Sequence, residues 1–227
     1  MDKTEIRNAA TVIMVRDAAT TPRILMGQRG TKAAFMPNKF VFPGGAVDEG
    51  DARIPLATPL QDRCIAQLSH QADPALIPAF ASAAIREVWE ETGLILGEQA
   101  KWPTPPPPDW RSFAAAGYLP SAAGLTFVFR AITPPGRPRR FDARFFMVDA
   151  KHIRGDIDDF THACDELSSL QWIPLEDVRH FDLPFITQVV MAEVSNLIRS
   201  GTKPETVPFF RNDDEESLFL RLGGKRP

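Results

Sequence analysis

Residues 86–94 read Arg-Glu-Val-Trp-Glu-Glu-Thr-Gly-Leu, and this stretch is the most informative part of the sequence. On an α-helix, Glu87, Glu90 and Glu91 occupy positions i, i+3 and i+4 and therefore lie on one face. Like charges at this spacing destabilise a helix by about 0.2–0.5 kcal/mol per pair. The helix-forming residues from 81 to 92, followed by Gly93, predict a helix that ends at the glycine.

Two interpretations of this acidic face are open. Acidic clusters on helices are usually solvated surfaces, and bare charge alone favours that interpretation. The neighbouring residues favour a metal site instead: Arg86 adjoins the cluster, and the turn Pro43-Gly44-Gly45 precedes the helix and could bring a backbone carbonyl near its face. Three oxygen ligands on one rigid face suit a hard divalent cation such as Mg²⁺ or Mn²⁺.

At this point the sequence resembles the Nudix hydrolase family. Residues 42–45 (FPGG) and 86–94 are similar to the two halves of the Nudix box, G-x5-E-x7-R-E-U-x-E-E-x-G-U, in which U is a bulky apolar residue. The second half matches at every specified position, namely Arg86, Glu87, Val88, Glu90, Glu91, Gly93 and Leu94. The order of expected strands and helices extends the resemblance over residues 8–200. The family cleaves a diphosphate linked to another moiety with the help of Mg²⁺ or Mn²⁺.

Two departures from the box are visible. The first half begins at Gly45, but Asp51 stands where the family has glutamate, and its side chain is one methylene shorter. In addition, 34 residues (52–85) separate Asp51 from Arg86 where the family has seven, which implies an insertion of 27 residues. We assign the insertion to residues 52–80. Because loop-closure entropy grows slowly with length, the two halves of the box can still dock.

The resemblance assigns roles to individual residues. Glu87, Glu90 and Glu91 would hold the metal together with the carbonyl of Gly45, and Arg86 would orient one glutamate through a bidentate ion pair. We predict that the catalytic set comprises Arg86, Glu90, Glu91 and an additional carboxylate from a later segment. The family often has a glutamate just before the strand that here begins near residue 168, so Glu166 is our choice, ahead of Asp165, Asp158 and Asp159. A solvated acidic loop remains an alternative for each of these four residues.

The substrate-binding candidates are basic residues, and the sequence points to Arg29, Lys32 and Arg144. The arginines at 137, 139, 140 and 144 form a cluster that is more typical of a solvated loop, unless Arg144 lies on a strand that faces the cleft and binds phosphate. His162 lies beside the acidic segment, and we interpret it as a bystander.

The remaining sequence predicts a mixed α/β fold. Apolar and β-branched runs predict strands at 9–16, 23–29, 40–42, 125–132, 143–148 and 168–173, and the first two form a hairpin. Leu56, Leu60, Cys64 and Leu68 predict one amphipathic helix in the insertion. Residues 183–199 predict another helix, residues 101–109 an exposed proline-rich connector, and residues 217–222 a short helix or strand. We expect a single domain (1–227) with a C-terminal extension (202–227), folded as a Nudix-like α/β/α sandwich with a mixed central sheet and an inserted helical segment.

Composition makes several functional classes less favoured. The chain has 227 residues with 29 acidic and 26 basic side chains, so it lacks the basic excess typical of nucleic-acid binders. The two cysteines and four histidines form no zinc motif, which fits an oxygen-ligated metal. No apolar run is long enough to span a bilayer and the N-terminus lacks signal-peptide features, so we expect a cytoplasmic protein without membrane partners. The oligomeric state is open, with a homodimer among the options.

Three functional hypotheses remain. The first is a metal-dependent hydrolase of a nucleotide-diphosphate derivative. The split box of this sequence resembles that of the subgroup related to peroxisomal acyl-CoA diphosphatases, and this resemblance implies CoA or acyl-CoA as substrate. The alternative substrate is ADP-ribose or another nucleotide derivative. The second is a Nudix-fold nucleotide-binding regulator without catalytic activity. The third is an unrelated α/β protein with a solvated acidic helix.

Overall fold

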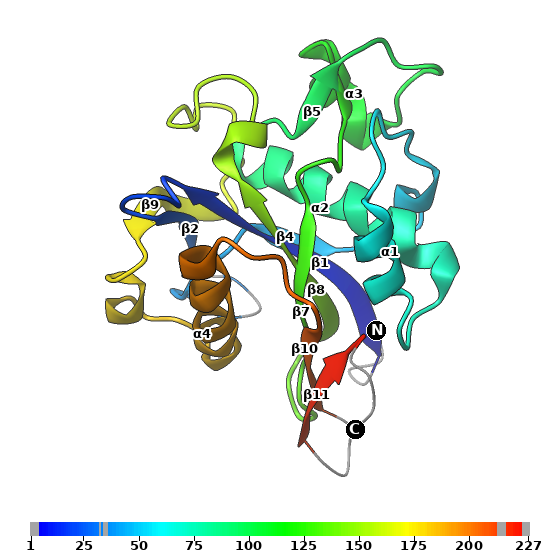
Figure 1. Ribbon diagram of the computed structural model, residues 1–227. Coiled ribbons are helices and arrows are strands. Elements are labelled where there is room, and N and C mark those ends of the chain that lie inside the picture. The colour runs from blue at the N-terminus through cyan, green and yellow to red at the C-terminus, as the bar shows by residue number, and fades with distance from the viewer. Residues whose placement is uncertain (1–4, 32, 34–35, 213–216, 224–227) are drawn as a thin grey trace.

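The computed structural model describes residues 5–31, 33, 36–212 and 217–223 (Figure 1). Its helices are α1 (Asp62–Leu68), α2 (Ile77–Thr92), α3 (Arg111–Ala115) and α4 (Phe185–Ser200). Its strands are β1 (Ile6–Arg16), β2 (Arg23–Arg29), β3 (Phe40–Val41), β4 (Gly44–Ala46), β5 (Gly97–Gln99), β6 (Tyr118–Pro120), β7 (Thr126–Ile132), β8 (Arg140–Asp149), β9 (Leu167–Pro174), β10 (Val207–Asn212) and β11 (Ser217–Leu222).

A mixed sheet forms the centre of the described structure. Its strand order is β11-β10-β7-β8-β1-β2-β3, with β4 also paired to β1 and β9 to β2. The long β1–β8 pairing and the β7–β10 pairing are parallel, and the other pairings are antiparallel. The predicted hairpin of β1 and β2 and the strands predicted at 40–42, 125–132, 143–148 and 168–173 are therefore confirmed, with shifts of a few residues at their ends.

Helices cover both faces of this sheet, as the α/β/α prediction requires (Figure 1). Alternate residues of β1 supply the two cores because successive side chains of a strand point to opposite faces. Val12 and Met14 pack in the core beneath α1 and α2, whereas Ile13 and Val15 pack in the core beneath α4. The chain thus buries each face of one sheet against a different helical layer.

The insertion differs from its prediction. Of residues 56–68, only 62–68 form a helix, so Leu56 and Leu60 lie outside it. Pro55 and Pro59 disfavour a helix through this stretch, and the chain at Thr58 instead forms a β-bridge with Ser121. Helix α2 begins at Ile77, four residues earlier than predicted, with a proline in its first turn, where proline is favoured.

The C-terminal extension joins the sheet. Strand β10 was not predicted, and it pairs with β7. Residues 217–222 form a strand rather than a helix and pair with β10. Residues 101–109 are mostly exposed, as predicted for the proline-rich connector.

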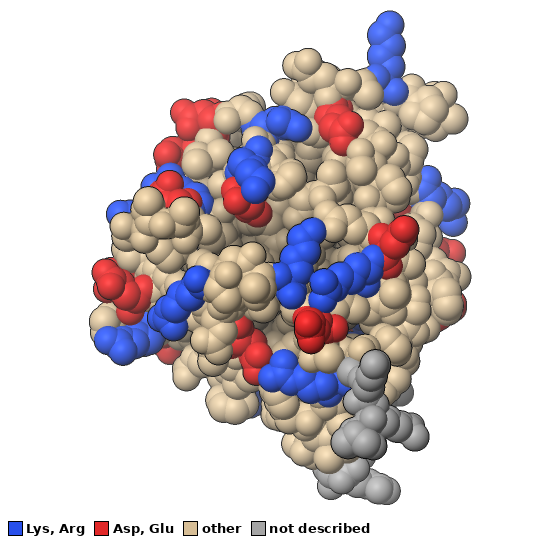
Figure 2. All heavy atoms as spheres, viewed as in Figure 1, with Lys and Arg blue, Asp and Glu red and all other residues tan. Residues whose placement is uncertain are grey.

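The surface drawn in Figure 2 carries positive and negative side chains interspersed, so on that face the near-balance of charge is also local. None of the helices formed by the described residues is both long and apolar enough to cross a lipid bilayer.

Candidate active site

The candidate site lies where the C-terminal half of α2 crosses β4. A side chain at Gly45 would place its Cβ 2.5 Å from the carboxylate oxygens of Glu87, and one at Gly44 would lie 2.5 Å from the carbonyl oxygen of Ala10. Gly44 also has a φ of 155°, which L-residues rarely adopt. Gly45 therefore lets α2 approach β4 closely, which brings Glu87 against the backbone of that strand, whereas Gly44 lets β4 lie close to β1.

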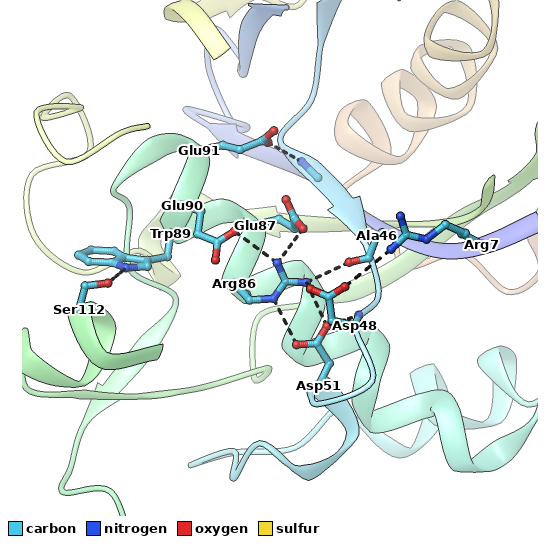
Figure 3. Close-up of polar contacts among 11 residues, drawn as sticks. Arg7, Ala46, Asp48, Asp51, Arg86, Glu87, Trp89, Glu90, Glu91 and Ser112 are labelled. Carbon is cyan, nitrogen blue, oxygen red and sulfur yellow. Dashed lines mark hydrogen bonds and ion pairs between the residues drawn. The ribbon is translucent and has the colours of Figure 1, made fainter. Parts of the chain in front are cut away.

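Arg86 is the centre of the polar contacts (Figure 3). Its Nε and Nη2 donate to the two carboxylate oxygens of Asp51 at 3.2 and 3.1 Å. Its Nη1 donates to Glu87 at 2.9 Å and to Glu90 at 3.3 Å. The prediction that Arg86 makes its bidentate pair with a glutamate is therefore wrong. Asp51 takes that place because its carboxylate lies side-on to the guanidinium, facing Nε and Nη2, and each glutamate receives a single hydrogen bond from Nη1.

Two further acceptors of Arg86 were not predicted. The carbonyl oxygen of Ala46 accepts from Nη2 at 2.9 Å, and a carboxylate oxygen of Asp48 lies 3.4 Å from the same nitrogen. The backbone N–H of Asp48 in turn donates to Asp51 at 2.8 Å. The spacing of three residues between the two aspartates, around Gly50, is the sequence signal that could have indicated this turn.

The three glutamates differ in burial. The side chain of Glu90 is 37% exposed and that of Glu87 12%, and Glu91 is 2% exposed as a residue. Glu91 accepts a hydrogen bond from the N–H of Gly44 at 2.7 Å (Figure 3). A solvated acidic face would leave all three in water, so this burial contradicts the third hypothesis.

Burial and mutual repulsion disfavour the charged forms of these carboxylates. Burial raises the pKa of Glu87 to about 7, although the charge of Arg86 opposes the shift. Burial also raises the pKa of Glu91 well above its ordinary value, and the charge of Glu87 adds to this effect. Burial raises the pKa of Glu90 as well. A cation placed beside these three carboxylates would therefore stabilise their charged forms.

The chemistry of this donor set fits Mg²⁺ or Mn²⁺, which prefer oxygen ligands. Within the described residues, the acidic side chains are not gathered into a closed set of three or more metal ligands. Arg86 instead contacts one carboxylate oxygen of Glu87 and one of Glu90. The other carboxylate oxygen of each glutamate would therefore be available to a cation.

The segment before β9 reaches the same site. Glu166 forms an ion pair with Arg29 at the end of β2, with 2.7 Å between Oε1 and Nη2. The charge of Glu166 also contributes to the raised pKa values of Glu87 and Glu91, after burial as the main cause. The structure thus brings the predicted Glu166 and Arg29 together beside the glutamates. The side chain of Asp158 pairs elsewhere, with Arg16 at 2.7 Å.

The prediction that Arg144 binds the substrate is wrong. Its side chain is 3% exposed, donates to Asn8 at 2.7 Å, pairs with Asp142 at 3.0 Å and lies over the ring of Phe80. A guanidinium that is buried and paired in this way is unsuited to binding a substrate phosphate. The arginine cluster itself is divided, because residues 137 and 139 are exposed whereas 140 and 144 are buried. The predicted Lys32 lies outside the described residues.

Comparisons with known proteins agree with this geometry. No family model matches the sequence. A Caenorhabditis elegans protein named as nudix hydrolase 7 is 32% identical over 180 residues, which cover 74% of this chain and 51% of the relative. The chain thus spans about half the length of that relative. The structure resembles the crystal structure of a Nudix hydrolase from Alicyclobacillus acidocaldarius with a TM-score of 0.57 and 28% identity, covering 86% of this chain and 96% of that one. With the glutamates, the arginine and the glycine turn of the box assembled in one place, the chain belongs to the Nudix hydrolase family.

Proposed function

We propose that the protein is a hydrolase that uses Mg²⁺ or Mn²⁺ to cleave the diphosphate of a nucleoside diphosphate linked to another moiety. The observation that carries this proposal is the assembly of Glu87, Glu90 and the buried Glu91 on one helix face, next to a fourth carboxylate, Glu166, and its partner Arg29. A protein that only packs or binds through this face would gain nothing from the repulsion among these groups.

Each residue of the site would have a distinct role in the reaction. Glu87, Glu90, Glu91 and the carbonyl of Gly45 would hold the cation. When bound, a divalent cation neutralises phosphate charge and lowers the pKa of bound water. Arg86 holds the glutamates in place from behind, because its guanidinium contacts Glu87 and Glu90.

Arg29 and Glu166 would act on the substrate side. Arg29 is a cation at the edge of the acidic site and would bind a phosphate oxygen of the incoming diphosphate. This binding would weaken its ion pair with Glu166, whose side chain is 56% exposed. The freed carboxylate of Glu166 would then accept a proton from the attacking water as general base.

The substrate panel begins with CoA and acyl-CoA because the split box resembles the subgroup that cleaves them. ADP-ribose and a dinucleoside polyphosphate complete the panel as the alternative substrates. Each is incubated with the purified protein and Mg²⁺ or Mn²⁺, and the products are separated by anion-exchange chromatography. We expect cleavage at the diphosphate of at least one member.

Glu90→Gln tests whether that cleavage belongs to this site. The substitution removes the charge of a half-exposed carboxylate, so it should lower kcat by about 10²–10⁴-fold while the melting temperature is retained. Glu176→Gln is the matched control, because Glu176 is an exposed glutamate outside the site. A wild-type protein that binds Mg²⁺ and a nucleotide of the panel but cleaves none of the panel would instead favour the non-catalytic nucleotide-binding regulator.

A further inference from the structure

Residues 156–166 present Glu166 to the site but form turns and irregular stretches rather than a helix or strand. In a segment without regular secondary structure, the backbone N–H and C=O groups must find hydrogen-bond partners elsewhere in the molecule or in water. Its attachment to the rest of the molecule therefore decides how well Glu166 is placed.

One attachment is a backbone hydrogen bond to the end of α2. The last carbonyl groups of a helix have no partner within the helix. The carbonyl of Glu90 is one of these, and it accepts a hydrogen bond from the N–H of Cys164 at 2.8 Å. The backbone of a predicted metal ligand is thus tied to the residue two positions before Glu166.

A second attachment is a ring contact between Trp89 and His162. Their centroids are 6.2 Å apart with an interplanar angle of 25°, so the rings are stacked. Trp89 is held from elsewhere by a hydrogen bond from its Nε1 to Ser112 at 2.9 Å, drawn in Figure 3, and by an edge contact with Phe113. His162 therefore stacks on a ring that is already fixed.

Gly93 makes room for this contact. A Cβ at Gly93 would lie 2.9 Å from the Cβ of His162, closer than real side chains approach. The glycine also ends α2 with a φ of 74°. Trp89 occupies an unspecified position of the Nudix box, so the Trp89–His162 stack is a property of this chain rather than of the motif.

We propose that Trp89 and His162 are positioning residues that clamp residues 156–166 onto the end of α2 and so set Glu166 against Arg29. The proposal rests on the hydrolase function proposed above, and it gives His162 a role beyond that of a bystander. The clamp acts through ring packing, so it needs an aromatic ring at 162 but no proton on it.

The first test compares His162→Ala with His162→Phe. Alanine removes the ring and should lower kcat by about tenfold with KM within about twofold, because a small displacement of a catalytic group slows the reaction. Phenylalanine keeps a ring for Trp89 and should restore kcat. Wild-type kcat in His162→Ala would overturn the proposal, and so would a His162→Phe enzyme as slow as His162→Ala, since that result assigns proton chemistry to the imidazole.

The second test needs no substrate. Hydrogen exchange at the amide of Cys164 reports on its bond to Glu90, and local opening speeds exchange. We expect His162→Ala to accelerate this exchange while His162→Phe and the control His180→Ala, a change at an exposed histidine, leave it unchanged. Unchanged exchange in His162→Ala would contradict the clamp. An inactive wild-type enzyme would contradict the proposed hydrolase instead, so the two failures are distinguishable.

Discussion

Arg86 shows how a single buried cation can organise an acidic site. A guanidinium has five N–H donors in a planar fork, and here they are directed at two carboxylate oxygens of Asp51, one each of Glu87 and Glu90, and the carbonyl of Ala46. The shorter side chain of Asp51 does not weaken this arrangement, because a short 3₁₀ turn at residues 51–53 brings its backbone close to the arginine.

The two aspartates on Arg86 should contribute very differently to stability. Asp51→Asn removes the partner charge from a buried pair and should lower the free energy of unfolding by about 3 kcal/mol. Asp48→Asn changes a side chain that is 56% exposed and 3.4 Å from the same nitrogen, so it should cost no more than about 1 kcal/mol. Urea unfolding of both variants measures the difference. Equal losses would contradict the central role assigned to Asp51.

Gly45 is predicted to be required for cation binding rather than for chain flexibility. Gly45→Ala would drive a methyl group against the Glu87 carboxylate and should abolish the rise in melting temperature on adding Mg²⁺. Gly50→Ala is the control, because Gly50 has a φ of −75° and its added Cβ meets nothing within 4 Å, so alanine there should add about 0.4–1 kcal/mol of stability. A full Mg²⁺ response in Gly45→Ala would refute this assignment.

At the level of elements, the insertion contributes to the core instead of lying on the surface. Leu60, Cys64 and Leu68 are buried in the same core as α2. Helix α1 also contacts the chain after α4, because Arg63 and Gln67 donate to the carbonyl of Pro204 at 2.6 and 3.0 Å. An insertion that splits the box thus supports the helix that carries the second half of it.

Leu68→Ala measures this support. Leu68 is 2% exposed, so removing its side chain should cost about 2–5 kcal/mol of unfolding free energy. Ala66→Ser on the exposed side of the same helix should change stability by no more than about 0.5 kcal/mol. Chemical denaturation distinguishes the two, and a loss below 1 kcal/mol in Leu68→Ala would identify the insertion as a peripheral addition.

At the level of the whole molecule, the site depends on distant segments meeting at one sheet. The Arg29–Glu166 pair joins residues 137 positions apart, and the Arg86–Asp51 pair joins residues 35 apart. The parallel pairing of β1 with β8 and of β7 with β10 ties the N-terminal strand, the middle strands and the C-terminal extension into that sheet.

We therefore expect the insertion and the extension to unfold together with the rest of the chain. Trp89, Trp102, Trp110 and Trp172 all pack in or against the core beneath α2, so tryptophan fluorescence reports on that face alone. Far-ultraviolet circular dichroism reports on all helices and strands. Coincident transitions by the two probes would support one domain, whereas a separate transition in circular dichroism would indicate an independent unit.

Local sequence patterns were enough to predict several features of the site. The spacing of the three glutamates and the glycine that ends α2 follow from helical periodicity and backbone conformation, which depend on neighbouring residues. Most strands of the sheet were predicted for the same reason. However, the glycines of β4 were predicted as part of a turn, residues 217–222 were left open between a helix and a strand, and β10 was missed because its short run lies in a segment of irregular pattern.

Which charged side chains pair with one another depends on long-range contacts in the folded chain. The tertiary structure selected Asp51 as the bidentate partner of Arg86, buried Arg144 against Asp142 and Phe80, and placed His162 on Trp89. These outcomes depend on which face of the sheet a side chain occupies and on contacts between residues far apart in the chain. Local sequence patterns do not encode such contacts, because the energy that selects them comes from burying one segment against another.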